Sequence, residues 1–106
     1  MIRLVNVDSY RLETDGYARE RRELARFNPQ FEFLRLRTEQ ELIDGCAEAD
    51  VVLVEHPDTP ITARVIQSLS QCRLVVKYGV GIDNIDLTAA TKDGIVVCNG
   101  PDYCTE

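Results

Sequence analysis

The sequence has no excess of positive charge and no pattern of metal ligands. Its 106 residues carry a formal net charge of -6, whereas a surface for nucleic acid or anionic lipid needs clustered Lys and Arg. The four cysteines (Cys46, Cys72, Cys98, Cys104) show no C-x-x-C spacing, and His56 is the only histidine. These absences argue against a nucleic-acid partner, a membrane partner and a metal site.

Long apolar runs are also lacking. The first residues, Met1 to Asp8, reach a polar residue too early for the apolar part of a signal peptide, and no run approaches the ~20 residues of a membrane span. We therefore expect a cytoplasmic protein with reduced thiols, in which Cys46 and Cys72 are small packing residues.

The composition is that of one ordinary globular domain. Apolar residues make up 44% of the chain and charged residues 28%. At 106 residues the chain is long enough for one hydrophobic core and too short for a typical two-domain enzyme.

Five short apolar runs of strand length recur along the chain and alternate with helical spacing. The runs are Ile2 to Val7, Phe31 to Leu36, Val51 to Val54, Leu74 to Val76 and Ile95 to Cys98. Helical spacing is typical of the stretches around Tyr17 to Phe27, Leu42 to Cys46 and Ile61 to Leu69, with expected N-caps at Thr38, Thr62 and Asp86, and with Gly94 ending the last helix. The order indicates alternating strands and helices throughout.

Several strands read as continuous apolar runs, which indicates burial on both faces. Such strands are typical of a parallel sheet covered by helices on each side. Right-handed crossovers then predict an α/β fold, a flavodoxin-like doubly wound parallel sheet of five strands, with its ligand crevice at the carboxyl ends of the strands.

Polar residues follow each predicted strand at this edge. They are Asp8, Arg37, Glu55 and His56, Lys77 to Gly81, and Asn99 and Gly100. Lys77 stands before two glycines, Gly79 and Gly81, and such a loop suits a small carboxylate through backbone N–H groups and one cation. The alternative is that these glycines only form a tight turn leading to Asp83 and Asn84.

Other interpretations of this edge are weaker. A dinucleotide fingerprint beginning at Gly79 fails at its third glycine, because position 84 is Asn. A phosphate-accepting receiver domain would match Asp8 and Lys77, but Glu55 stands where its acceptor Asp would be. His56 has no evident catalytic partner, so it is either a structural histidine or part of the crevice.

The stretch VKYGVGIDNIDLTAATKDGIVVCNGPDYCTE, residues 76–106, resembles the segment shared by D-isomer-specific 2-hydroxyacid dehydrogenases. It is similar to phosphoglycerate dehydrogenases and, in its last six residues, to C-terminal-binding proteins. The resemblance implies that residues 1–106 are the N-terminal segment of a substrate-binding domain. It also implies a parent that is an NAD(P)-dependent oxidoreductase interconverting 2-keto acids and D-2-hydroxy acids.

The resemblance also implies roles for single residues. The backbone amides of Gly79, Val80 and Gly81 would hold the substrate carboxylate, and Val80 would also lie against the nicotinamide. The full set of implied substrate-binding residues is His56, Lys77, Tyr78, Gly79, Val80 and Gly81. Two positions depart from the family pattern, since Gly100 and Cys104 stand where members often have other residues.

Much of such an enzyme is expected outside this chain. NAD or NADP would be bound mainly by a dinucleotide-binding domain that the chain lacks, and the catalytic Arg, carboxylate and His would also follow Glu106. We therefore expect a partial domain with an exposed apolar edge, no catalytic residue within it, no activity of the isolated chain, and a homodimeric parent. The alternatives are a nucleotide-sensing regulator similar to the C-terminal-binding proteins, or a stand-alone flavodoxin-like binding or receiver domain.

Overall fold

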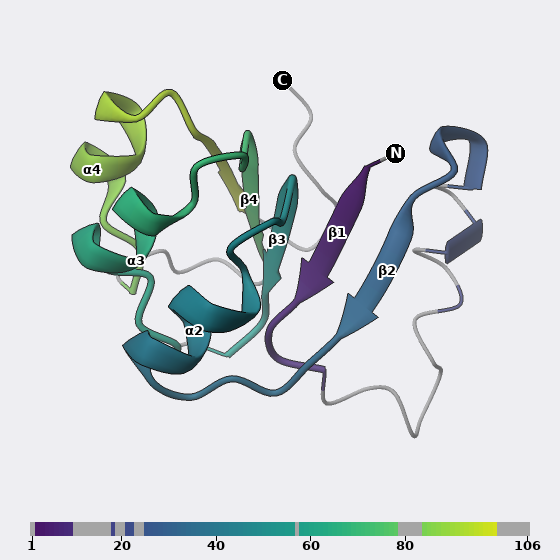
Figure 1. The fold of residues 1–106 in the computed structure, drawn as a ribbon, viewed down its shortest axis with the longest axis horizontal. Coiled ribbons are helices and arrows are strands. Elements are labelled where there is room, and N and C mark those ends of the chain that lie inside the picture. Colours follow the sequence, from purple (N-terminus) through teal and green to yellow (C-terminus); the bar gives the residue numbers. More distant parts are fainter. Residues whose placement is uncertain are drawn as a thin grey trace.

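The computed structural model describes residues 2–9, 18, 21–22, 25–56, 58–78 and 84–99. Its strands are β1 (Arg3–Asn6), β2 (Gln30–Phe33), β3 (Val51–Val54), β4 (Leu74–Lys77) and β5 (Val96–Asn99). They form one parallel sheet in the order β2-β1-β3-β4-β5 (Figure 1). The predicted α/β class and five-stranded parallel sheet are confirmed.

Strand β1 marks the point where the direction of winding reverses. The chain first passes outward from β1 to β2, and then returns across β1 to β3, β4 and β5. In open sheets of this kind, ligands bind outside the carboxyl ends of the strands at the reversal. The residues that directly follow β1 and β3 are therefore the first place to look for a site.

Three helices, α2 (Glu39–Gly45), α3 (Ala63–Ser68) and α4 (Leu87–Lys92), lie on one face of the sheet (Figure 1). Each begins at a predicted cap, at Thr38, Thr62 and Asp86 respectively. Thr38 and Glu41 form a full capping box, in which the Thr38 hydroxyl accepts from the Glu41 N–H at 3.1 Å and the Glu41 carboxylate accepts from the Thr38 N–H at 3.1 Å.

The first predicted helix falls mostly outside the described residues. Within that stretch the structure has a 3-10 turn, η1 (Ala25–Phe27), all of it exposed. The second predicted strand is shorter than expected, because Arg35 leaves β2 and forms an isolated antiparallel bridge with Asp8. The last predicted helix end is confirmed: Gly94 follows α4 with φ +74°, a conformation that favours glycine.

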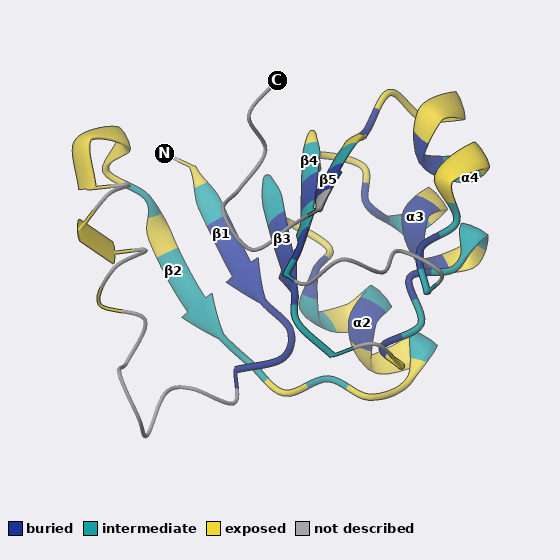
Figure 2. Cartoon of the chain, turned by 180° about the vertical axis from the view of Figure 1, so that it is seen from behind, coloured by how far each residue is buried: buried dark blue, intermediate teal, exposed yellow. Residues whose placement is uncertain are grey.

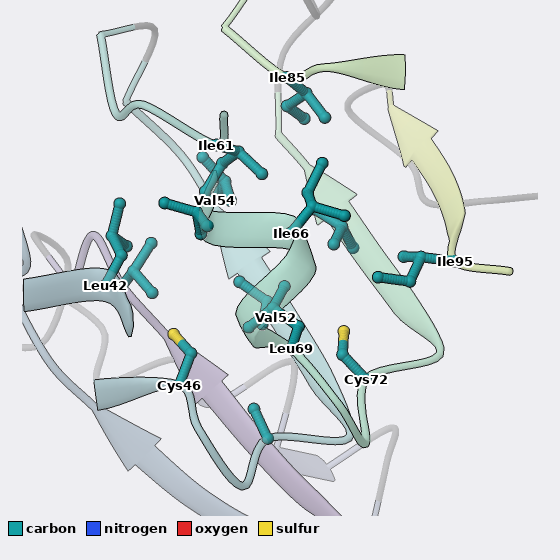
Figure 3. Packing of buried hydrophobic residues seen from close by; sticks show 14 of the residues in the cluster. Leu42, Cys46, Val52, Val54, Ile61, Ile66, Leu69, Cys72, Ile85 and Ile95 are labelled. Atoms are coloured by element: carbon teal, nitrogen blue, oxygen red, sulfur yellow. The ribbon is translucent and has the colours of Figure 1, made fainter. Parts of the chain in front are cut away.

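The hydrophobic core lies between the sheet and the helices α2 to α4. Central strands β1 and β3 are mostly buried, whereas the edge strand β2 is half-buried (Figure 2). Leu42, Val52, Ile66 and Ile95 belong to this core and pack around α3 (Figure 3). Full burial of one such side chain contributes about 1.5–3 kcal/mol, so this layer is the main source of stability.

Two of the four cysteines are packing residues, as expected. Cys46 and Cys72 are buried free thiols. Burial raises the pKa of Cys46 from 9.0 to about 12 and also raises that of Cys72. Cys98, in contrast, is disulfide-bonded, so the expectation of reduced thiols is wrong at that residue. Spacing along the sequence does not show which thiols meet in space.

The side of the sheet near β5 is less well covered. Leu87 on α4 and Val96 on β5 are exposed by 41% and 56%, and both line an open groove between these two elements. These exposures agree with the expected apolar edge. Among the described residues, no helix is long and apolar enough to cross a membrane.

Candidate functional site

Asp8, which follows β1, holds the start of the loop that follows β3. It is buried, with 1% exposure. Its Oδ2 accepts hydrogen bonds from the backbone N–H groups of Glu55 at 2.8 Å and His56 at 2.9 Å, and its Oδ1 accepts from the Thr59 hydroxyl at 2.8 Å. A carboxylate with three such donors has a fixed orientation, so the loop from Glu55 to Thr59 is fixed to β1.

The neighbouring Asn6 side chain supports this arrangement from within β1. Its Oδ1 accepts from the Asp8 N–H at 2.9 Å, and its Nδ2 donates to Oε2 of Glu55 at 2.9 Å. Asn6 is fully buried, and both ends of its amide have a partner. We call the five residues Asn6, Asp8, Glu55, His56 and Thr59 the carboxyl-edge cluster.

His56 lies where the sequence predicted it, directly after β3 at the carboxyl edge. The ring is half-buried, and its Nδ1 accepts from the Asp58 N–H at 3.1 Å. Because this bond occupies the Nδ1 lone pair, the neutral ring carries its proton on Nε2. In this tautomer the Nε2 atom of His56 is a hydrogen-bond donor.

Lys77 is a buried cation at the end of β4, between Val54 of β3 and Asn99 of β5. It has 3% exposure, and its Nζ donates to the Tyr78 carbonyl at 3.0 Å. Within the described ranges this is the single hydrogen bond of an ammonium that has three donors. A buried charge with unused donors favours an anionic ligand.

Three of the predicted site residues, Gly79, Val80 and Gly81, lie outside the described residues. Their roles with the substrate carboxylate and the nicotinamide therefore stay predictions. The described residues on either side of residues 79–83 are Tyr78 and Asn84. The Tyr78 N–H donates to the Val54 carbonyl at 2.8 Å, which fixes the first of these flanks to the end of β3.

Sequence reasoning missed three residues that organise this edge. Thr59 lies in the loop after β3 and contacts Asp8, Asn84 contacts the same loop, and Asn6 lies inside an otherwise largely apolar strand. A signal was available for Asn6, because a polar residue within a buried strand needs hydrogen-bond partners. No comparable signal marked Thr59 or Asn84, whose partners lie far away in the sequence.

The described residues show no metal site. Among them, no three His, Cys, Asp or Glu residues are grouped so that they could hold a metal ion. The side chains of Thr38, Thr62 and Asp86 each accept a hydrogen bond from one N–H in the first turn of α2, α3 and α4 respectively.

Comparison with known proteins relates the chain to one family. The family model described as D-isomer specific 2-hydroxyacid dehydrogenase, catalytic domain, matches residues 11–106. D-3-phosphoglycerate dehydrogenase of Synechocystis sp. is 43% identical over 65 residues, which are 61% of this chain and 12% of that protein. Glyoxylate reductase of Korarchaeum cryptofilum is 42% identical over 65 residues, which are 61% of this chain and 19% of that protein.

A solved structure shows the same fold. The NAD+-bound 3-phosphoglycerate dehydrogenase of Entamoeba histolytica matches with a TM-score of 0.81 at 22% identity, over 92% of this chain and 32% of that chain. The chain therefore spans about a third or less of the length of these three relatives.

Proposed function

This chain belongs to the D-isomer-specific 2-hydroxyacid dehydrogenase family, and from this premise we propose that its parent protein reduces a small 2-keto acid to the D-2-hydroxy acid, or catalyses the reverse. In this proposal the cofactor is NAD or NADP, bound mainly by a domain outside this chain. The described residues supply the wall of the site that binds the acid, and the groups that exchange protons lie elsewhere in the parent.

The buried Lys77 ammonium is the observation that carries this proposal. It has 3% exposure and one described hydrogen bond, and residues 79–81 with their two glycines begin two positions later. A substrate carboxylate beside Lys77 would offset the cost of burying this charge, and backbone N–H groups of Gly79, Val80 and Gly81 would donate hydrogen bonds to its second oxygen. Such charge-assisted bonds contribute about 1.5–3 kcal/mol each.

His56 has a supporting role in the proposal. In this proposal His56 faces the substrate from the loop after β3, while Lys77 and Tyr78 approach from the end of β4. The Asp8 hydrogen bond to the His56 N–H fixes the backbone of this residue, so it needs little reorganisation on binding. Two separate loops thus contribute to one small polar site.

Steady-state kinetics of the full-length parent test this function. The assay is oxidation of NADH and NADPH with glyoxylate, hydroxypyruvate, pyruvate and a longer 2-keto acid. Lys77→Met keeps an unbranched side chain that is one atom shorter but removes its ammonium charge. We expect kcat/KM for the preferred keto acid to fall about 10- to 150-fold, which corresponds to the loss of one charge-assisted bond. The KM for the cofactor should change less than about twofold, because in this proposal the cofactor is held elsewhere.

Lys92→Met is the matched control. Lys92 is an exposed lysine at the end of α4, so the same chemical change there should leave both constants within about twofold of wild type. A parent that oxidises neither cofactor with any 2-keto acid would overturn the proposal. So would a folded Lys77→Met variant with unchanged kcat/KM.

The two alternatives give different results in the same assay. A nucleotide-sensing regulator would bind NADH without turning over any acid. The receiver alternative is disfavoured by family membership and by Asp8, because both carboxylate oxygens already accept hydrogen bonds from the loop after β3. Treatment with acetyl phosphate should accordingly leave the mass of the chain unchanged.

A further inference from the structure

The Asn84 side chain connects the two loops of the proposed site. Its Nδ2 donates to the carbonyl oxygen of Thr59 at 2.8 Å and to that of His56 at 3.3 Å. Both acceptors are carbonyl oxygens, so the nitrogen of the amide must face them, and only a side chain with two N–H donors can satisfy both.

The backbone next to Asn84 makes the same connection. The Ile61 N–H donates to the Asn84 carbonyl at 3.0 Å, and the Asp86 N–H donates to the Ile61 carbonyl at 2.9 Å. Ile61 and Ile85 form a parallel bridge and are both buried. A short ladder outside the main sheet therefore joins the chain after β3 to the chain that follows residues 79–83.

The loop after β3 is consequently held from two directions, by an acceptor that binds its N–H groups and by a donor that binds its carbonyl groups. Asp8 accepts from its N–H groups at Glu55 and His56, whereas Asn84 donates to its carbonyls at His56 and Thr59. Asp8 and Asn84 both hold His56, and both also hold Thr59, Asp8 through its hydroxyl and Asn84 through its carbonyl. In addition, both residues that flank 79–83 are tied to the chain around β3, Tyr78 through Val54 and Asn84 through the contacts just described.

We propose that Asn84 is a positioning residue, which fixes the loop after β3 so that His56 faces the substrate. This inference rests on the proposed function. Asn84 itself acts through His56 and Thr59, and it has no contact of its own with the reacting atoms.

The test uses the full-length parent and the substitution Asn84→Asp. The two side chains have nearly the same shape, but a carboxylate cannot donate and would repel the two carbonyl oxygens. We expect kcat/KM for the 2-keto acid to fall about 10- to 100-fold, the size expected when reacting groups are displaced by about 1 Å. The KM for the cofactor should stay within about twofold, and Asn84→Ser, which keeps one donor, should be intermediate.

Asn28→Asp is the matched control, because Asn28 is exposed and lies just before β2, at the opposite end of the sheet from the site. Its φ of 50° is tolerated by Asn and Asp alike, so both kinetic constants should equal those of wild type.

Assays are run at a temperature where circular dichroism shows every variant folded. A purely structural role would leave the constants of folded Asn84→Asp unchanged. If Asn84→Asp does not fold, Asn84→Ser alone decides the result.

Hydrogen exchange gives a second readout that does not depend on turnover. In Asn84→Asp, amides within residues 55–61 should exchange at least about tenfold faster than in wild type, because local opening becomes easier. Suppose that the wild type turns over, but that folded Asn84→Asp shows unchanged kinetic constants or unchanged hydrogen exchange. That result would overturn the positioning role alone. Absence of turnover in the wild type would instead overturn the proposed function, and the positioning role with it.

Discussion

The hydrophobic core beneath α2 to α4 and the carboxyl-edge cluster are both buried, but different contacts hold them. In the core, side chains such as Val52 and Ile66 pack without directional bonds. In the cluster, Asn6 and Asp8 are just as buried, yet each polar atom of their side chains has a hydrogen-bond partner. Apolar packing accepts changes of similar volume, whereas a polar cluster requires each donor to match an acceptor.

The hydrophobic core and the carboxyl-edge cluster therefore have different roles. The core brings strands and helices together and supplies most of the stability. Each hydrogen bond of the cluster adds little net stability, since it replaces a bond to water, but leaving one of its buried groups unpaired is costly, and the cluster determines where the loop after β3 lies. The fold should therefore tolerate conservative changes in the core, while the site should not tolerate conservative changes in the cluster.

Asp8→Ala should give the largest loss of stability, because it leaves three donors without an acceptor. A buried donor without a partner costs about 1–3 kcal/mol, so we expect the free energy of unfolding to fall by about 5 kcal/mol. Urea denaturation followed by circular dichroism measures this loss. If the free energy of unfolding falls by less than about 1 kcal/mol, water replaces the carboxylate, and the cluster does not depend on each donor having its protein acceptor.

Ile66→Ala should have the next largest effect, and by a different mechanism. Ile66 is exposed by 1%, and its truncation leaves a cavity that costs about 3 kcal/mol. The conservative change Ile66→Val should cost only about 1 kcal/mol. Neither change should alter the hydrogen exchange of residues 55–59 beyond the change in global stability. A specific increase in exchange there would show that core and cluster are not separate.

A smaller effect is expected at high pH from the thiol of Cys46. Its folded pKa is raised to about 12 from an ordinary 9.0, so the unfolded thiol ionises first and stability is lost as pH rises above 9. At pH 10 the loss from this one group is about 1 kcal/mol. The measurement compares the decrease in unfolding free energy between pH 7 and pH 10 in wild type and Cys46→Ala, and the decrease should be smaller in the variant. Equal decreases would contradict burial of this thiol.

The core and the helix starts were predictable because their signals are local. Continuous apolar runs identified the central strands, and β3 has the predicted bounds Val51–Val54. The cap of α2 was predictable because Thr38 and Glu41 stand three residues apart and satisfy each other's backbone. Element ends were less accurate, since β4 extends to Lys77 and β5 begins at Val96, where tertiary pairing rather than composition decides.

The cluster was predictable only in part because its bonds are long-range. The position of a residue after a strand identified Asp8, His56 and Lys77 as candidates. It gave no information on the partners of Asp8, and Asn84 was interpreted as a turn residue although its amide crosses to a different loop. Such pairings depend on the register of the finished sheet, which no short segment of sequence contains.

The bonds of Asp8 also impose an order on synthesis. Its partners follow it by 47, 48 and 51 residues. At about 5–20 residues per second, a ribosome needs roughly 3–10 s to add that many. During this interval β2 is also made, but these three donors to Asp8 are not yet present. The carboxyl-edge cluster therefore cannot be complete before Thr59 is made, and translation speed between β2 and β3 sets the earliest time at which it can form.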